Sequence, residues 1–215
     1  MEVDILYRGG TAEIVEKKSR FIANVFPVQT PEEALAYIEQ MKKKYYDARH
    51  NCFAYVIGPN HEWMRSSDDG EPSGTAGHPM LDILTGAGVH NALVVITRYF
   101  GGTLLGTGGL VRAYSEAAKR GLENSVVVTK KSGKKMSIRT DYNGIGKLQY
   151  LIAMLELTEL ECEYGEGVNI VLLVPEGKEE KLIAEVTEAT SGKAVFEERG
   201  VVQYGNIDGK IVFLE

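Results

Sequence analysis

A glycine-rich turn between an apolar run and an amphipathic segment most constrains how this chain can fold. Residues 92–97, ALVVIT, have the continuous apolar character of a strand buried on both faces. Five glycines follow within nine residues, and residues 107–123 then have the apolar periodicity of a long helix. Glycine adopts positive φ angles and lets the backbone approach another group closely. The pattern therefore predicts a buried strand, a tight turn and a helix in direct succession.

This turn is also the main candidate for a binding surface. The free N–H groups at the start of a helix can receive an anion, and arginines nearby can add charge-assisted hydrogen bonds. The alternative is that the glycines only allow the helix to pack tightly on the sheet. Because one close crossing needs fewer than five glycines, we favour a role in ligand binding. The candidate residues on this segment are Arg98, Tyr99, Gly101, Gly102, Gly106, Gly109 and Arg112.

The turn does not match the usual nucleotide-binding loops. A Walker A loop continues from its last glycine into Lys and Ser or Thr, whereas Gly106 is followed by Thr107 and Gly109 by Leu110. The GxGxxG spacing of dinucleotide-binding loops is also absent from this segment. We therefore expect neither ATP nor NAD, and no other cofactor is indicated.

An acidic stretch, residues 66–79, supplies a second group of candidates. Three carboxylates within four residues can hold a hard cation, but the alternating ligand order of an EF-hand is missing. Turn chemistry and helix capping by Ser73 or Thr75 explain most of these residues, so we expect no metal and no regular structure. From this region we retain Asp69, Glu71 and His78 as binding candidates.

His50 and Cys52 are two residues apart in a β-prone run, which places their side chains on one face. That arrangement permits a Cys–His nucleophile. The favoured interpretation is that Cys52 is a small, inert, buried side chain, and only His50 is retained as a binding candidate. No GxSxG or other nucleophile motif occurs, so we expect a binding protein rather than an enzyme.

The remaining pattern predicts two α+β domains, residues 1–130 and 131–215, joined by the polar run 129–135. In the first, a polar turn at 17–19 separates two strands, and Thr30, Pro31 and Glu33 predict a helix start. The second has a β-α-β-β-α-β alternation, which is typical of the ferredoxin-like fold. Its expected strands are 136–142, 158–164, 168–174 and 194–204, and its helices begin at Asn143 and Glu176.

Composition limits the possible partners. The net charge of −6 disfavours strong binding of nucleic acid by this chain alone, because phosphate neutralisation dominates that affinity. The two cysteines have no metal-binding spacing and suggest a reducing compartment. No signal peptide or apolar run long enough for a membrane span is apparent, so we expect a cytoplasmic protein without membrane association.

Residues 74–114, together with DDGEPSGTAGHP and RHNCFAYVIG before them, resemble the signature of the IMPACT/YigZ family. The resemblance extends through the chain, because bacterial members have a ferredoxin-like second domain. It implies a ribosomal-protein-S5 domain-2-like fold for the first domain, and an elongation factor G domain V-like second domain. Mammalian and fungal relatives regulate translation under amino-acid starvation, using an additional N-terminal domain that is not matched here. For this chain, the resemblance therefore implies only the functions that belong to the shared domain.

These observations support three functional hypotheses. The first is a translation-associated regulatory protein, active in a stress response, that binds RNA, the ribosome or a ribosomal partner through the glycine-rich turn. The alternative is a hydrolase or transferase that acts on a small anionic substrate at the acidic stretch and His78. A third is a protein-interaction module that uses the ferredoxin-like domain.

Overall fold

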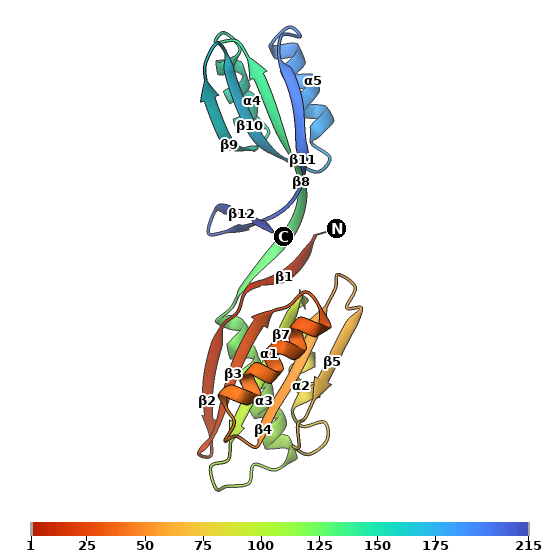
Figure 1. Ribbon diagram of the computed structural model, residues 1–215, viewed down its shortest axis with the longest axis vertical. Coiled ribbons are helices and arrows are strands. Elements are labelled where there is room, and N and C mark those ends of the chain that lie inside the picture. Colours follow the sequence, from red (N-terminus) through yellow and green to blue (C-terminus); the bar gives the residue numbers. More distant parts are fainter. Residues whose placement is uncertain (1, 215) are drawn as a thin grey trace. The chain divides into compact units, whose positions relative to one another are not determined.

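The computed structural model describes residues 2–214 and divides into two compact α+β units. One unit comprises Val3–Thr129, and the other comprises Glu2 and the chain from Lys130 onward. Five helices and twelve strands are described within these residues (Figure 1). The expected α+β class with two units is therefore observed.

The first unit is built on a five-stranded antiparallel sheet. Its strands lie in the order β2 (Thr11–Glu16), β3 (Ser19–Pro27), β7 (Ala92–Tyr99), β4 (His50–Ile57) and β5 (Trp63–Ser67). The predicted turn between the first two strands is present at Lys17 and Lys18, which both have positive φ. The central strand β7 is buried from Ala92 to Arg98, as its apolar sequence predicts.

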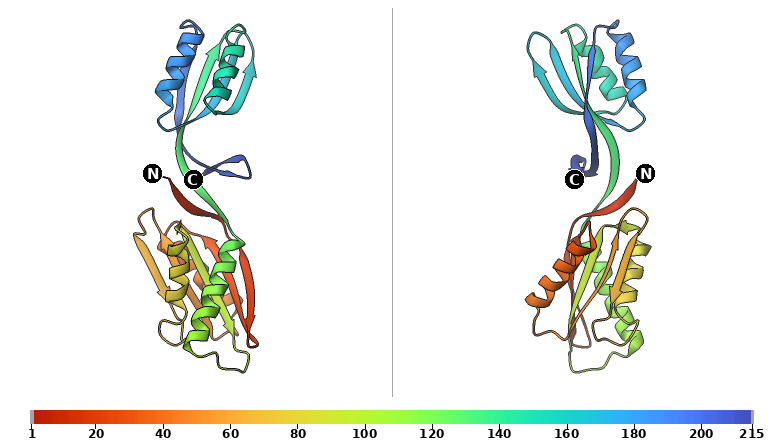
Figure 2. Two further views of the ribbon diagram at one scale, coloured as in Figure 1. Left: turned by 180° about the vertical axis from the view of Figure 1, so that it is seen from behind. Right: turned by 45° about the vertical axis from the view of Figure 1, so that its right-hand side comes forward.

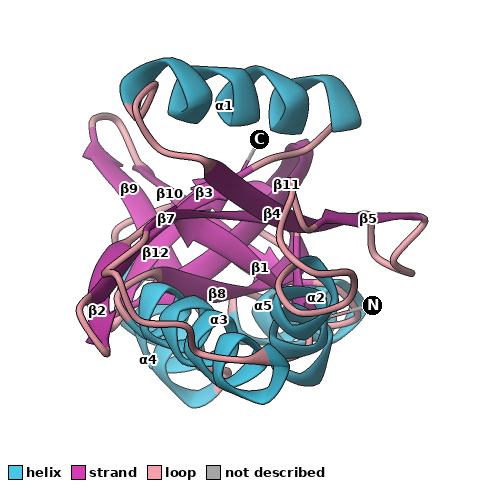
Figure 3. Ribbon diagram, turned by 90° about the horizontal axis from the view of Figure 1, so that it is seen from below, coloured by secondary structure: helices cyan, strands magenta, loops and turns pink. Residues whose placement is uncertain are grey.

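Helices cover both faces of this sheet. Helix α1 (Pro31–Lys44) lies on one face, and helices α2 (Gly77–Gly86) and α3 (Thr107–Glu123) lie on the other (Figure 3). The predicted cap of α1 is present, since the Thr30 hydroxyl accepts from the Glu33 N–H at 3.2 Å. A short parallel pair, β1 (Val3–Arg8) and β6 (Val89–His90), was not predicted.

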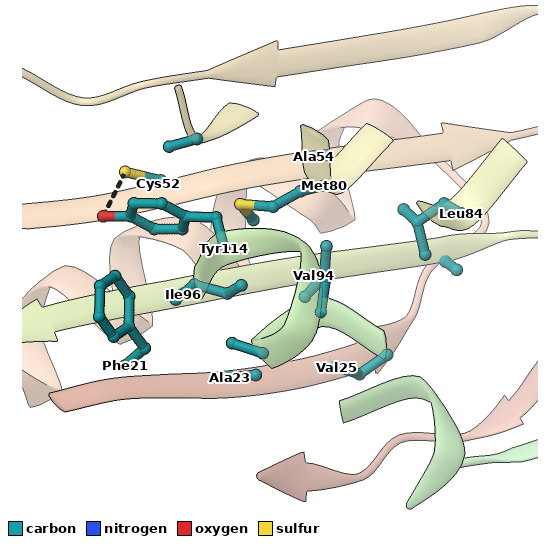
Figure 4. Packing of buried hydrophobic residues seen from close by; sticks show 14 of the residues in the cluster. Phe21, Ala23, Val25, Cys52, Ala54, Met80, Leu84, Val94, Ile96 and Tyr114 are labelled. Carbon is teal, nitrogen blue, oxygen red and sulfur yellow. Dashed lines mark hydrogen bonds between the residues drawn. The ribbon is translucent and has the colours of Figure 1, made fainter. Parts of the chain in front are cut away.

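The core beneath α2 and α3 packs around Tyr114. Its ring meets Phe21 edge to face, with the centroids 5.1 Å apart, and its hydroxyl points towards Cys52 (Figure 4). Further along α3, small residues let the helix approach the sheet, since a Cβ on Gly121 would lie 3.1 Å from Ala23. The glycine-rich turn is thereby anchored at both ends, by β7 and by the buried face of α3.

The second unit has the predicted β-α-β-β-α-β order. These elements are β8 (Val126–Thr140), α4 (Ile145–Met154), β9 (Thr158–Tyr164), β10 (Val168–Pro175), α5 (Glu179–Ala189) and β11 (Val195–Ile207). The strands lie in the order β9-β10-β8-β11, and a further strand, β12 (Lys210–Leu214), pairs with β11. Both helices pack against one core on the sheet (Figure 2).

Several element boundaries differ from the prediction. The polar run 129–135 is not a linker but part of β8, because Gly133 pairs with Pro175 on one side and with Val202 on the other. Strand β12 was missed, although Asp208 and Gly209 form a two-residue hairpin turn before it, both with positive φ. Helix α2 begins at Gly77, inside the stretch expected to be irregular. None of the helices in the described part of the chain is long and apolar enough to cross a membrane.

Candidate functional site

The candidate residues gather where strand β4 begins and strand β7 ends. The two strands are antiparallel, so these ends meet at the same edge of the sheet, and His50 is the register partner of Arg98. The acidic loop between β5 and α2 lies against this edge, where Cys52 and Asn51 contact Asp68 and Asp69. Residues from three separate parts of the sequence, the start of β4, the end of β7 and the acidic loop, therefore form one cluster.

Arg98 and Glu71 form a buried ion pair at the centre of the cluster. Nη1 of Arg98 donates to both carboxylate oxygens of Glu71, at 2.7 and 3.0 Å, and the two side chains are 7% and 3% exposed. The Tyr114 hydroxyl donates to the same carboxylate at 2.8 Å. Because the charge of Arg98 is neutralised inside the protein, this arginine is not available as a free cation for a ligand. Its Nε has no hydrogen-bond partner within residues 2–214.

The carboxylates of the acidic loop shape the loop itself. Asp68 accepts from the N–H groups of Gly74, Ala76 and Gly77 at 2.8 to 2.9 Å, which explains why α2 starts early. Burial of Asp68 acts against ionisation, but these three donors outweigh it and lower the pKa of the carboxyl. Asp69 accepts from the N–H of Asn51 at 2.7 Å.

Cys52 is not a nucleophile in this arrangement. Its sulfur is fully buried, 2.9 Å from the Asp68 carbonyl oxygen and 3.4 Å from the Tyr114 hydroxyl. Burial, reinforced by the nearby carboxylates, raises the pKa of the thiol well above its usual range. Because the thiolate is the nucleophilic form, the inert interpretation of Cys52 holds.

His50 has a defined tautomer. Its Nδ1 lies 2.9 Å from the carbonyl oxygen of Asp69, and a carbonyl only accepts. Nδ1 therefore carries the hydrogen, and Nε2 of the neutral ring is left as an acceptor. His50 also lines the cavity described below, so this acceptor belongs to the candidate site.

The glycines of the turn have different roles. A Cβ on Gly101 would collide with the backbone of Lys18, and the Gly101 N–H donates to the Ser19 hydroxyl at 3.1 Å. Gly102 and Gly106 have φ angles of 85° and 71°, which favour glycine. At Gly109 a Cβ would lie 3.1 Å from Leu105. Close packing and turn geometry thus account for four of the five glycines, more than we expected. Helix α3 has no side-chain cap at Gly106.

An open cavity of about 490 Å³ lies beside the turn. Phe100 and Leu104 are 54% and 84% exposed, and Arg49 is exposed as well. The Tyr99 hydroxyl donates to the Asp47 carboxylate at 2.7 Å, and this bond raises the pKa of Tyr99 to about 12. The cavity is lined by Asp47, Ala48, Arg49, His50, Arg98, Tyr99, Phe100 and Leu104.

Three predicted site residues lie elsewhere. Arg112 does not face the same cavity as Arg98: it is exposed on α3 and lines a separate hollow of about 530 Å³ with Gly109 and Lys119. His78 is exposed on α2 and does not line the cavity beside Phe100. The two arginines therefore do not form one anion clamp, because Glu71 draws Arg98 inward while Arg112 stays on the helix surface.

Sequence reasoning did not select Phe100, Leu104 and Asp47 as site residues. The available signal was the presence of large apolar residues inside a glycine-rich loop, where a tight turn alone requires none. Tyr114 is buried on α3, and its bond to Glu71 depends on the fold and not on spacing in the sequence.

The chain was compared with known proteins. Residues 17–122 match the Impact N-terminal domain, and residues 138–193 match a domain of unknown function, DUF1949. IMPACT family member YvyE of Bacillus subtilis (strain 168) is 41% identical over 88% of this chain and 87% of its own length. The chain belongs to the IMPACT family. The candidate cavity of this IMPACT family protein lies entirely within the Impact N-terminal domain.

Other IMPACT proteins extend the comparison. YigZ of Escherichia coli (strain K12) is 34% identical over 82% of this chain and 87% of its own length. Protein IMPACT of Oryctolagus cuniculus is 36% identical over 43% of this chain but only 30% of its own length. A crystal structure of a hypothetical protein aligns with a TM-score of 0.60 at 31% identity, covering 91% of this chain and 96% of the other.

Proposed function

We propose that this protein is a translation-associated regulator, and that the cavity beside the glycine-rich turn binds an unpaired segment of RNA, on the ribosome or on a ribosomal partner. Membership of the IMPACT family supports the link with translation. A role in regulation under stress, in the cytoplasm, belongs to the same proposal. For the two units we propose the ribosomal-protein-S5 domain-2-like and ferredoxin-like folds, with the domains divided at residues 130 and 131.

The observation that carries the RNA proposal is Phe100. An aromatic ring 54% exposed in a glycine-rich loop provides a face on which an unpaired base can stack. Leu104, 84% exposed on the same rim, adds apolar surface. Neither side chain contributes to the three buried core clusters, although the Arg98 guanidinium lies 5.7 Å from the centre of the Phe100 ring.

An unpaired cation lies at the same cavity. Arg49 lines it and has no ion-pair partner among residues 2–214. The guanidinium of Arg20 lies 5.7 Å from the centre of the Tyr99 ring, but it is already paired with the Glu13 carboxylate at 2.7 Å. A cation beside an exposed aromatic ring is a combination that holds single-stranded nucleic acid. Since the chain is acidic overall, affinity for free RNA is modest and a larger ribosomal partner completes the binding surface.

The hydrolase or transferase alternative has less support. Asp68, Asp69 and Glu71 all accept hydrogen bonds from the protein, so none of them is a free general base. Cys52, the candidate nucleophile, is fully buried and therefore does not reach a substrate.

A protein-interaction role for the second unit is favoured by a separate observation. Tyr150 on α4 is 68% exposed, and it lines a groove of about 470 Å³ with Glu185 and Glu188 of α5. Met154 and Ile183 are also exposed on these helices. An apolar patch of this kind suits a protein partner, and it is compatible with RNA binding by the first unit.

Fluorescence anisotropy with a labelled single-stranded RNA tests the RNA proposal. Phe100→Ala and Arg49→Ala should each weaken binding by about 1–3 kcal/mol, and affinity should fall as salt rises. Trp63→Ala and Arg65→Ala are matched controls, because Trp63 is also 54% exposed and both lie on β5. Equal losses in the variants and their controls, or affinity indifferent to salt, would count against the proposal.

A further inference from the structure

Two histidines outside the candidate site lie side by side in the first unit. His61 is in the turn that follows β4, and His90 belongs to β6. Their ring centroids are 4.4 Å apart, with the ring planes tilted by 43°. Both side chains are partly exposed. The pair lies beside Gly58, just after the end of β4, whereas His50 of the candidate site is the first residue of β4. The histidine pair and the candidate site are therefore at opposite ends of β4.

The ring of His90 is held in one tautomer. Its Nδ1 lies 2.9 Å from the carbonyl oxygen of Gly58, so Nδ1 carries the hydrogen and donates it. The other ring nitrogen, Nε2, then keeps its lone pair. Metal-ligating histidines are commonly oriented in this way, by a backbone carbonyl that accepts from the nitrogen that does not bind the metal.

His61 presents a ring nitrogen with no partner. Its Nε2 is shielded from solvent and makes no hydrogen bond within residues 2–214. The backbone of His61 has a φ of 57°, a left-handed conformation that is uncommon for a residue other than glycine. An unsatisfied buried polar atom costs free energy unless a partner satisfies it.

We propose that His61 and His90 together form a binding site for a divalent transition-metal ion of the imidazole-preferring class, Zn²⁺, Ni²⁺ or Cu²⁺. The nitrogen ligands are Nε2 of each ring. The nearby Glu62 carboxylate already accepts from the backbone N–H and the side-chain amide of Asn60, both at 3.1 Å. No three His, Cys, Asp or Glu side chains in the described chain surround one point, so the protein supplies these two ligands and no third side chain of those types. Such a site holds an exchangeable ion rather than a permanent structural one.

Isothermal titration of the full chain with NiCl₂ and with ZnCl₂ tests this proposal. The wild type should bind one ion, and His90→Gln should weaken that binding by about tenfold or more. His61→Asn is the suitable second variant, because asparagine tolerates the left-handed backbone conformation. His78→Gln is the control, since His78 is an exposed histidine outside the pair. Its binding should match that of the wild type.

A measurement on the unmodified protein makes the test independent of how the variants fold. Imidazole nitrogen resonances of His61 and His90 should shift on addition of Zn²⁺, while those of His50 and His78 stay in place. Absence of binding, binding retained in both pair variants, or Zn²⁺ shifts confined to the other histidines would each overturn the proposal.

Discussion

Arg98 and Glu71 form an ion pair inside the first unit, where each charge depends on the other. Burial of two charges is unfavourable unless hydrogen bonds compensate, and here Tyr114 adds a third donor to the carboxylate. The pair joins the acidic loop to the end of β7, which lines the cavity. In physical terms Arg98 is a positioning residue for the cavity rather than its cation.

Removal of one partner should therefore destabilise the protein strongly. Arg98→Ala or Glu71→Ala should each lower the free energy of unfolding by about 3–5 kcal/mol, because a buried charge is left without its counterion. The double substitution Arg98→Met with Glu71→Leu should cost less than the sum of the single changes. Urea unfolding of the three variants measures this. Single losses below about 1 kcal/mol would show that the pair is not buried as described.

Glycines 101 and 108 offer a second comparison at single positions. A Cβ on Gly101 meets the Lys18 backbone, whereas a Cβ on Gly108 has only the Arg112 side chain nearby, at 3.7 Å. Gly101→Ala should destabilise the protein by about 1–3 kcal/mol, and Gly108→Ala should be neutral or stabilising by up to about 1 kcal/mol. Thermal unfolding of both variants distinguishes them. A similar loss in both would contradict the packing role assigned to Gly101.

Spacing in the sequence located the glycine-rich turn and the buried strand before it, because both depend on local composition. It did not identify the partner of Arg98, since Glu71 lies 27 residues away and meets it only through the fold. Spacing also suggested that Arg98 and Arg112 lie at one site, but in the fold they line two different cavities.

At the scale of elements, periodicity predicted the type of most helices and strands, but it failed where polar residues form a central strand. The run TKKSGKK has the composition of a linker, yet it pairs with β11 from Lys131 and with β10 from Gly133. Backbone hydrogen bonds to β10 and β11 stabilise this segment, and its long side chains leave their charges near the surface.

Amide hydrogen exchange tests this assignment. Amides of residues 133–139 should exchange slowly, with protection close to that of β10, because this part of the strand lies between β10 and β11. Glu166, in the turn between β9 and β10, provides the fast-exchanging reference within the same unit. Rapid exchange throughout 133–135 would mean that this run is a linker after all.

At the scale of the whole molecule, the two units have separate hydrophobic cores. The buried residues of the first unit's cores lie within 6–118, and those of the second unit's core lie within 136–186. Family membership was predicted from the long motif around the turn and is confirmed by the match to the Impact N-terminal domain. The natural ligand was not predictable from the same motif, because many of its residues serve turn geometry and loop packing.

The central claim is that the cavity beside Phe100 contacts RNA during translation. A photo-crosslinking amino acid at position 104, where Leu104 is 84% exposed on the cavity rim, reports directly on what lies there. The same group at position 63, on β5, is the control. We predict that irradiation of cells captures ribosomal RNA from position 104 and not from position 63. Capture of protein alone at position 104, or equal capture of RNA at both positions, would contradict the claim.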